Sequence, residues 1–105
     1  ATGTTVLFRG GQHSRMRLIG GHIATISHIQ QAATIAIENG GGVDAATGTT
    51  NATAGLANEL TLTSNTMFGE WDDVVVNVTT AAGVDSQYIL VLYFVSESWS
   101  KQNYV

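Results

Sequence analysis

The strongest constraint on the fold is an uninterrupted apolar run from Tyr88 to Val95. Its residues are all β-branched, aromatic or leucine, the side-chain types that are enriched in strands. A helix that spans a bilayer needs about 20 apolar residues, so the run is too short to be one. A short run of this kind is typical of a strand that is buried on both faces, in the middle of a sheet or between two layers. We therefore expect it to be the central strand of an all-β core.

Shorter segments alternate between apolar and polar residues, which is the period of a half-buried strand. Residues 15–19, 59–63 and 73–79 all show this pattern. The turn at 81–86 contains Gly83 and is expected to join the strand at 73–79 to the long run as an antiparallel hairpin. The predicted core comprises the 88–95 run together with Leu60, Leu62, Val74, Val76 and Val78.

Residues 22–38 are compatible with two secondary structures. Apolar residues recur there at helical spacing, and Gly40 would be a good helix terminator. The segment is also rich in β-branched residues, which lose side-chain freedom in a helix, and it follows the Gly20-Gly21 pair. We therefore favour strands, with Ile35 and Ile37 on one face and a break or bulge at the two glycines.

About seven short strands separated by Gly, Asn and Asp turns predict an all-β fold. We expect one domain over residues 1–105, an antiparallel β-sandwich of jelly-roll-like type, because 105 residues is close to the common domain size. Residues 1–14 are predicted to be a short extended N-terminal arm. Residues 39–58, rich in Gly, Ala and Thr, are predicted to be a long loop.

Charged residues make up only 11% of the chain, and there is no cysteine. The absence of cysteine excludes disulfides and thiolate zinc sites. Freely diffusing small domains usually carry about a quarter to a third charged residues on their surface. A surface with so little charge is better suited to contact with another protein, so the composition favours a protein that works in an assembly.

The charges are unevenly distributed along the chain. Arg9, Arg15 and Arg17 fall within the first 17 residues, which contain no acid, whereas the remainder has Lys101 as its only Lys or Arg and all eight acids. A basic arm on an acidic body suits assembly in which the arm contacts an acidic neighbour. The alternative is that the three arginines simply occupy exposed strand positions. Four basic residues on a chain of net charge −4 offer few phosphate contacts, which argues against nucleic-acid binding.

The histidines do not predict a metal site. His22 and His28 could share one face of a strand, but at about 3.3 Å per residue they would lie roughly 20 Å apart. His13 could join them only through the tertiary fold. The chain also lacks a phosphate-binding loop and a serine nucleophile elbow.

The acidic residues Glu70, Asp72, Asp73 and Asp85 are the remaining candidates for chemistry. On a strand, Glu70 and Asp72 would lie about 7 Å apart on one face, a separation found in glycosidase carboxylate pairs. With Asp73 they could also form a rim for a hard cation such as calcium. Acids beside Trp71 at the start of a strand are more often solvated turn residues. We therefore expect no catalytic residue, no bound metal and no cofactor.

The two tryptophans, Trp71 and Trp99, are better candidates for contacts than for chemistry. Indole rings could stack on sugars, but they more often close the end of a sandwich core or anchor a protein interface. Together with Arg9, Arg15 and Arg17 they form the predicted interface set.

A small, acidic, cysteine-free β domain with a basic N-terminal arm and Thr/Gly/Ala-rich loops resembles the small decoration (cement) proteins of tailed-phage heads. The resemblance is one of size and character over the whole chain, and no motif aligns to transfer a residue's role. It implies homo-oligomers, often trimers, that sit on a capsid lattice and clamp neighbouring shell subunits. The expected function is therefore that of a non-enzymatic structural protein on the virion surface, whose partners are itself and a larger protein shell.

Two other functions remain open. One is a secreted, lectin-like sugar-binding module, located outside the cell, with Trp71 or Trp99 as the platform and Asp72 and Asp73 as hydroxyl acceptors. The other is a pilus or fimbrial subunit that shares strands between copies, using the long run and the Thr4–Arg9 segment. Size in solution separates the three functions. A sugar-binding module predicts a monomer, a decoration protein predicts a small closed ring, and a pilus subunit predicts an open polymer.

Overall fold

The computed structural model describes residues 2–11, 13–26, 33–51, 53, 55–80 and 87–96. These residues form strands and turns and include no helix, so this part of the chain holds none long and apolar enough to cross a membrane. The strands are β1 (Gly3–Phe8), β2 (Met16–Thr25), β3 (Thr34–Asn39), β4 (Asp44–Thr49), β5 (Ala57–Glu59), β6 (Thr61–Leu62), β7 (Met67–Phe68), β8 (Val74–Thr80) and β9 (Tyr88–Ser96).

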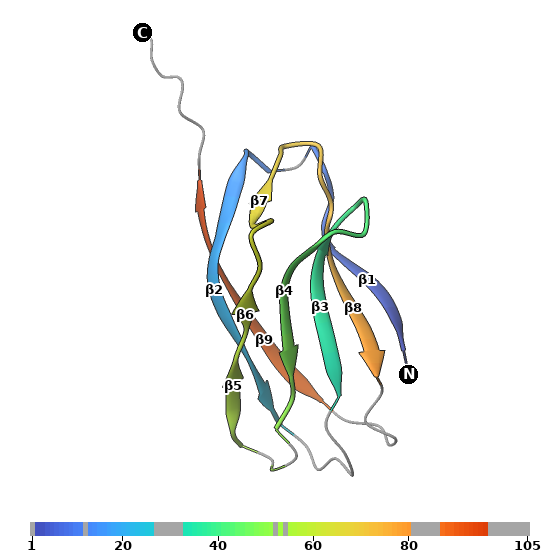
Figure 1. Ribbon diagram of the computed structural model, residues 1–105, viewed down its shortest axis with the longest axis vertical. Helices are drawn as coiled ribbons and strands as arrows, with labels where there is room; N and C mark the ends of the chain where they lie inside the picture. Colours follow the sequence, from blue (N-terminus) through green and yellow to red (C-terminus); the bar gives the residue numbers. More distant parts are fainter. Residues whose placement is uncertain are drawn as a thin grey trace, which may run out of the picture.

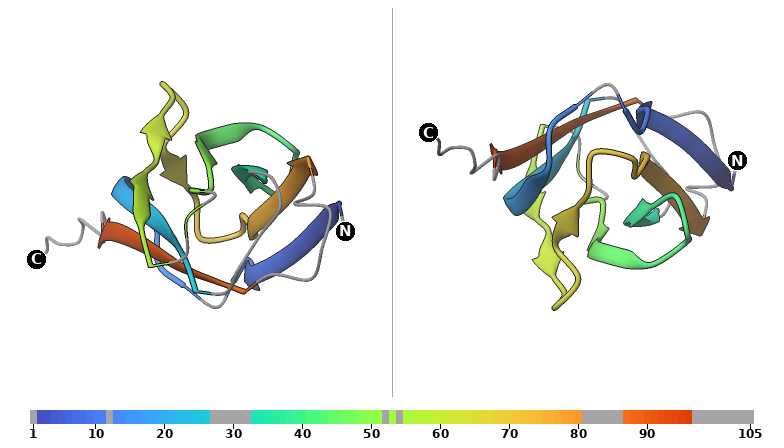
Figure 2. Two further views of the ribbon diagram at one scale, coloured as in Figure 1. Left: turned by 90° about the horizontal axis from the view of Figure 1, so that it is seen from below. Right: turned by 90° about the horizontal axis from the view of Figure 1, so that it is seen from above.

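The strands form two antiparallel sheets, so the all-β, antiparallel prediction is confirmed, although the strand order does not establish a jelly roll. The first sheet has the order β1-β8-β3-β4-β6. In the second sheet, β2 pairs with β5 and β7 along one edge and with β9 along the other. Figures 1 and 2 show the two sheets wrapped around a common interior.

One extended segment links the sheets along one side of the molecule. Its first part, β5, pairs with β2, and its second part, β6, pairs with β4. Between them the amide of Leu60 donates a 2.9 Å hydrogen bond to the carbonyl of Gly21. The Leu60 side chain is buried against Gly21 and Gly48, where a β-carbon would come within 3.0 and 2.5 Å of its methyl groups. The two glycines therefore make room for the leucine that closes this side of the fold.

The core lies between the two sheets, as the alternating segments predicted. Ile35 and Ile37 of β3 both point inward and are buried, and Val74 of the neighbouring strand β8 is buried in the same cluster. The main buried cluster consists of Leu18, Ile23, Ile35, Ile37, Ala45, Ala46, Leu60, Phe68 and Val74.

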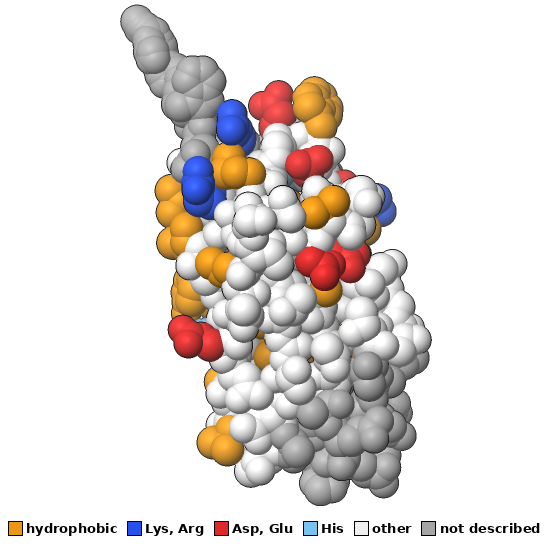
Figure 3. Space-filling view, in the orientation of Figure 1, with side chains coloured by type: hydrophobic (Ala, Val, Ile, Leu, Met, Phe, Trp, Pro, Cys, Tyr) orange, Lys and Arg blue, Asp and Glu red, His pale blue; other side chains and the backbone are white. Residues whose placement is uncertain are grey.

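The long apolar run is not the central strand that the sequence predicted. β9 is an edge strand that pairs only with β2 among the described residues. Its inward side chains are half-buried, whereas Ile89, Tyr93 and Val95 on the other face are exposed. Figure 3 shows hydrophobic atoms along the flank where Figure 1 places β2 and β9. The prediction of burial on both faces is therefore wrong, because no described layer covers the outer face.

Three other predictions need correction. The prediction of a long loop over residues 39–58 is wrong for Asp44–Thr49. This segment forms β4 and is buried at Ala45 and Ala46. Leu62 is exposed, because the chain moves from one sheet to the other after Leu60. The predicted hairpin between residues 73–79 and the apolar run is also wrong, because β8 and β9 lie in different sheets. The turn proper, 81–86, lies outside the described residues.

The segment from 16 to 39 is extended wherever it is described, which confirms strands over the helical alternative. β2 continues through Gly20-Gly21, which pair regularly with β9, and the register shifts just before them, between Leu18 and Gly20. The N-terminal arm is also extended, but part of it belongs to the sheet. β1 pairs with β8 and has all six of its residues exposed.

Candidate interaction surface

The two long edge strands of the fold run in the same direction. Each neighbouring pair along β1-β8-β3-β4-β6 is antiparallel, and so is each pair along β5-β2-β9. β6 continues the segment that begins with β5, so these two strands run in the same direction. This relates the strand directions of the first sheet to those of the second. It follows that β1 and β9 are parallel, as Figure 1 shows. They are the two ends of an otherwise linked series of strands.

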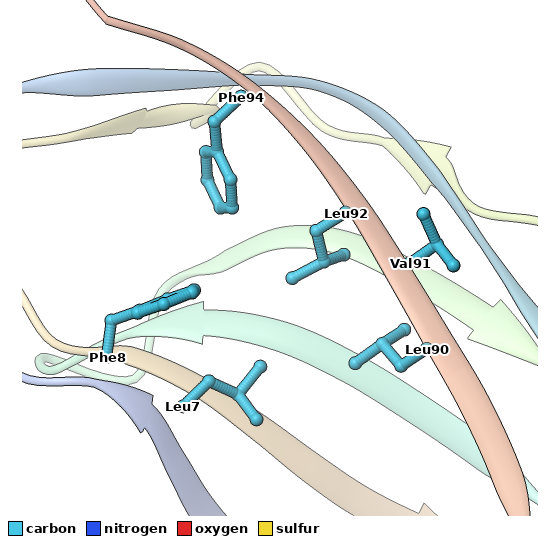
Figure 4. A pocket seen from close by; sticks show the side chains of 6 residues that line it. All are labelled: Leu7, Phe8, Leu90, Val91, Leu92 and Phe94. Atoms are coloured by element: carbon cyan, nitrogen blue, oxygen red, sulfur yellow. The ribbon is translucent and has the colours of Figure 1, made fainter.

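Between β1 and β9 lies an open groove of about 480 Å³, which we call the seam. It is lined by Leu7, Phe8, Leu90, Val91, Leu92 and Phe94. Figure 4 shows the side chains of Leu90 and Leu92 directed into the opening, with Val91 on the other side of β9. At one end the rings of Phe8 and Phe94 meet edge to face with centroids 6.5 Å apart. Among the described residues, the seam is therefore an apolar gap that this aromatic contact closes at one end.

The seam leaves part of the core incompletely covered. The inward side chains of β9, and those of β8 next to β1, pack against the buried cluster but stay only partly buried. These residues are Val76, Val78, Tyr88, Leu90, Leu92 and Phe94. By contrast, Ile35 and Ile37 on β3, farther from the opening, are buried. An additional strand in this position would remove more apolar surface from water, the main favourable term in association.

The strands that border the seam have few of the features that usually protect a free edge. Edge strands in soluble proteins are normally short, or carry charges, prolines or bulges that prevent pairing with another chain. β9 has nine residues and β1 has six, and neither contains a charge or a proline. The one irregularity in β1 is a register shift between Val6 and Phe8. Within the part of the chain that the structure describes, each of these strands is paired on one side only, so each offers backbone groups to an incoming strand.

The charged residues at the end of the seam where the two phenylalanines meet are engaged within the chain. The guanidinium of Arg9 lies 3.9 Å from the Asp73 carboxylate, whose other oxygen accepts a 2.7 Å hydrogen bond from the Gly10 amide. His13 contacts the backbone carbonyl of Asp72 at 2.7 Å through Nε2. These contacts attach the chain after β1 to the turn before β8.

Asp73 is expected to stabilise this end mainly as a hydrogen-bond acceptor. Asp73→Ala should lower the free energy of unfolding by about 1–2 kcal/mol, because the part-buried Gly10 amide loses its partner. Asp73→Asn keeps an oxygen acceptor and should cost less than about 1 kcal/mol, the usual limit for an exposed ion pair. Urea denaturation of both variants, with the exposed Asp44→Ala as a control, measures the difference. Equal losses for the two Asp73 variants would show that the charge matters more than the acceptor.

The predicted acidic residues that the structure describes lie in the turn before β8. Glu70 and Trp71 belong to a turn and not to a strand, and the Asp72 carboxylate accepts a 2.9 Å hydrogen bond from the Gly69 amide. Trp71 is 79% exposed and borders Gly11. No group of three or more His, Asp or Glu side chains that could hold a metal occurs in the described residues.

The other residues that the sequence analysis considered lie on or near β2 or outside the described residues. Arg15 is exposed just before β2, and Arg17 is exposed on β2 opposite Val95 of β9. His22 is on β2, with its ring 5.9 Å from that of Tyr93. Trp99, His28 and Asp85 lie outside the described residues. The arginines are thus near the end of β9 and do not line the seam.

The seam itself was not predicted, although its two strands were noted separately. The run at 88–95 and residues 4–8 of the Thr4–Arg9 segment are uncharged and largely apolar, but sequence does not show that they face each other. Comparisons with protein-family models, with curated proteins and with solved structures find no match to this chain. Its function must therefore be argued from the seam and its surroundings.

Proposed function

We propose that this chain is a non-enzymatic structural protein that works by self-association, as a subunit that decorates or cements a larger particle such as a capsid. The observation that carries the proposal is the pair of uncharged, unprotected edges on either side of an apolar seam. A protein that stayed monomeric would keep these edges exposed to non-specific pairing. Association through them would use uncharged strands of a chain whose net charge of −4 otherwise opposes self-contact.

A strand-sharing filament subunit is the second candidate, because the same seam favours it. β1 is exposed at every residue, and its described backbone pairing is with β8 alone. If β1 left its own sheet and paired with the next copy, subunits would join head to tail and could grow without limit. The two functions share one surface and differ in whether the assembly closes.

The surroundings of Trp71 give less support to a sugar-binding function. The carboxylates of Asp72 and Asp73 both accept hydrogen bonds from backbone amides of the fold. Oxygens used in this way hold turns together and are less available to bind sugar hydroxyls. The exposed ring of Trp71 suits a contact with protein equally well.

Sedimentation velocity and light scattering of the full chain test the proposed function. At about 100 μM, where an interface of micromolar affinity is nearly saturated, we expect one discrete species whose mass is a multiple of 11.0 kDa. An open, polydisperse polymer would instead support the filament subunit. A monomer at every concentration would contradict both.

A further inference from the structure

We infer that the outer face of the sheet formed by β5, β2 and β9 is a second self-association surface, on which two copies of this chain pack face to face. The two-fold axis lies between the two faces and runs perpendicular to the strands. The inference rests on the proposed self-association and adds to it a contact on a different side of β9 from the seam.

The middle of this outer face is apolar. Residues directly opposite each other in an antiparallel pair point to the same side of the sheet, so the outward side chains of β2 and β9 lie together. Ile89, Tyr93 and Val95 of β9 are between 44% and 52% exposed, and Ile19 of β2 is 52% exposed. Figure 3 shows the hydrophobic atoms of this flank. A cluster of large exposed apolar side chains marks an interaction surface.

Opposite charges occupy the two ends of the same face. Arg17 is exposed near the start of β2, and Arg15 is exposed just before that strand. The exposed Glu59 of β5 lies opposite His22, which is five residues beyond Arg17 and thus about 15 Å farther along the sheet. Among the described residues the Glu59 carboxylate takes part in no salt bridge. The face is therefore basic at one end, apolar in the middle and acidic at the other end.

This distribution of charge selects the partner and the axis. A two-fold axis along the strands would keep both copies in one direction and bring the two arginine ends together. An axis perpendicular to the strands reverses one copy, so that Arg17 of each copy lies beside Glu59 of the other. Complementary charges fix the register of an interface and disfavour the alternative, in which like charges meet. The symmetry makes this contact twice in each dimer.

The separation of the two faces allows the charged groups to meet. Packed sheets lie about 10 Å apart, and Arg17 and Glu59 belong to neighbouring strands about 4.8 Å apart. Their long side chains can span this distance from the two sides. Near the axis Ile19 of one copy lies opposite Ile19 of the other, so the apolar middles of the two faces cover each other.

The area of the face sets the expected affinity. The ten residues of β2 extend over about 33 Å, and three strands are about 15 Å wide, so the footprint is roughly 450 Å² on each copy. Interfaces of this size belong to the small class that forms weak, reversible complexes. We expect a dissociation constant on the order of 10 μM. The chain would then be mostly monomeric at the few micromolar used for circular dichroism and mostly associated at about 100 μM.

The first test places a charge near the axis. Ile19 is exposed in the monomer, so Ile19→Lys should leave the fold and its circular dichroism spectrum unchanged. In the dimer two ammonium groups would be buried side by side, and the dissociation constant should rise at least about 100-fold. Val43→Lys, at a residue 43% exposed in the turn after β3, is the matched control. Sedimentation at about 100 μM should give an even multiple of 11.0 kDa for the native chain and the control, and half the native mass for the Ile19 variant.

The second test reverses the charges at the two ends. Arg17→Glu makes both ends of the face acidic, and Glu59→Arg makes both ends basic, so each variant alone should associate about tenfold more weakly. In an equal mixture of the two variants every acidic end meets a basic end, and the native affinity should return. Glu70→Arg is the matched control, because it makes the same change of charge in the exposed turn before β8. It should neither weaken association by itself nor restore it when mixed with Arg17→Glu.

The outcomes separate this inference from the proposed function. A native assembly that is unchanged by Ile19→Lys, or one with an odd number of copies, would retain self-association and overturn this surface. Charge reversals that have no effect, or that are not rescued by mixing, would overturn the two-fold arrangement. A native chain that stays monomeric at every concentration would overturn both the inference and the proposed function.

Discussion

Replacement of Phe68 with alanine is expected to lower the free energy of unfolding by about 3–5 kcal/mol, the usual range for a buried phenylalanine. Phe68 is 1% exposed, and its ring meets that of Phe94 edge to face at 5.7 Å. Alanine would leave a cavity below β9 and remove this aromatic contact, which contributes beyond simple burial. For a chain of this length the melting temperature should fall by roughly 12–30 °C.

The control for Phe68→Ala is Tyr93→Ala, which removes an aromatic ring that is 48% exposed on the outer face of β9. It should cost about 1 kcal/mol or less, since little buried surface is lost. Thermal unfolding followed by circular dichroism, with both variants at equal concentration, makes the comparison. Similar melting temperatures for the two variants would show that the interior around Phe68 is not the core described above.

The exposed face of β9 shows where sequence reasoning reaches its limit. An apolar run establishes that both faces of a strand are apolar, and Leu90 and Leu92 do point into the fold. It does not show whether a second layer of the same chain covers the other face. Ile89 and Tyr93 have no such layer among the described residues. The run therefore predicted strand formation correctly and strand position incorrectly.

β4 was missed for a different physical reason. Its buried residues are Ala45 and Ala46, which are too small to give a hydrophobic pattern in the sequence. The sheet accepts small residues there because Leu60, from the segment that crosses between the sheets, fills the space beside Gly48. Large residues at period two made β3 and β8 predictable. A strand of small residues, beside which the side chain of another segment fills the space, has no such alternating hydrophobic pattern in its sequence.

The candidate site could be predicted only in its parts. The sequence shows that residues 88–95 and 4–8 are uncharged and largely apolar, and it suggested that the long run and the Thr4–Arg9 segment could be shared between copies. That they border one opening, and that they are parallel, depends on long-range pairing through every other strand. The arginines attracted attention through charge alone, yet Arg9 is paired with Asp73 in its own chain.

The glycine pair in β2 provides the second large expected effect. Gly21→Ala should destabilise the fold by about 1–3 kcal/mol, the usual cost of adding a group to a filled interior. A β-carbon on Gly21 would lie 2.6 Å from the Val91 carbonyl oxygen and 3.1 Å from a methyl group of Leu92. The first of these is backbone of the paired strand, which cannot rotate away, so β9 itself must shift from β2.

Gly20→Ala is the matched control, one residue away in the same strand. Its β-carbon would have only the ring of Tyr93 nearby, at 3.7 Å, an ordinary van der Waals contact. Alanine in a strand is intrinsically better than glycine by about 0.5–1 kcal/mol, so this variant should be neutral or slightly more stable. Urea denaturation at one protein concentration gives both values, and equal slopes would show that the unfolded states are comparable. The two changes are chemically identical, so opposite effects on stability would locate the close contact between β2 and β9 at Gly21. A Gly21→Ala protein as stable as the native chain would mean that β9 does not lie against β2 in the register described.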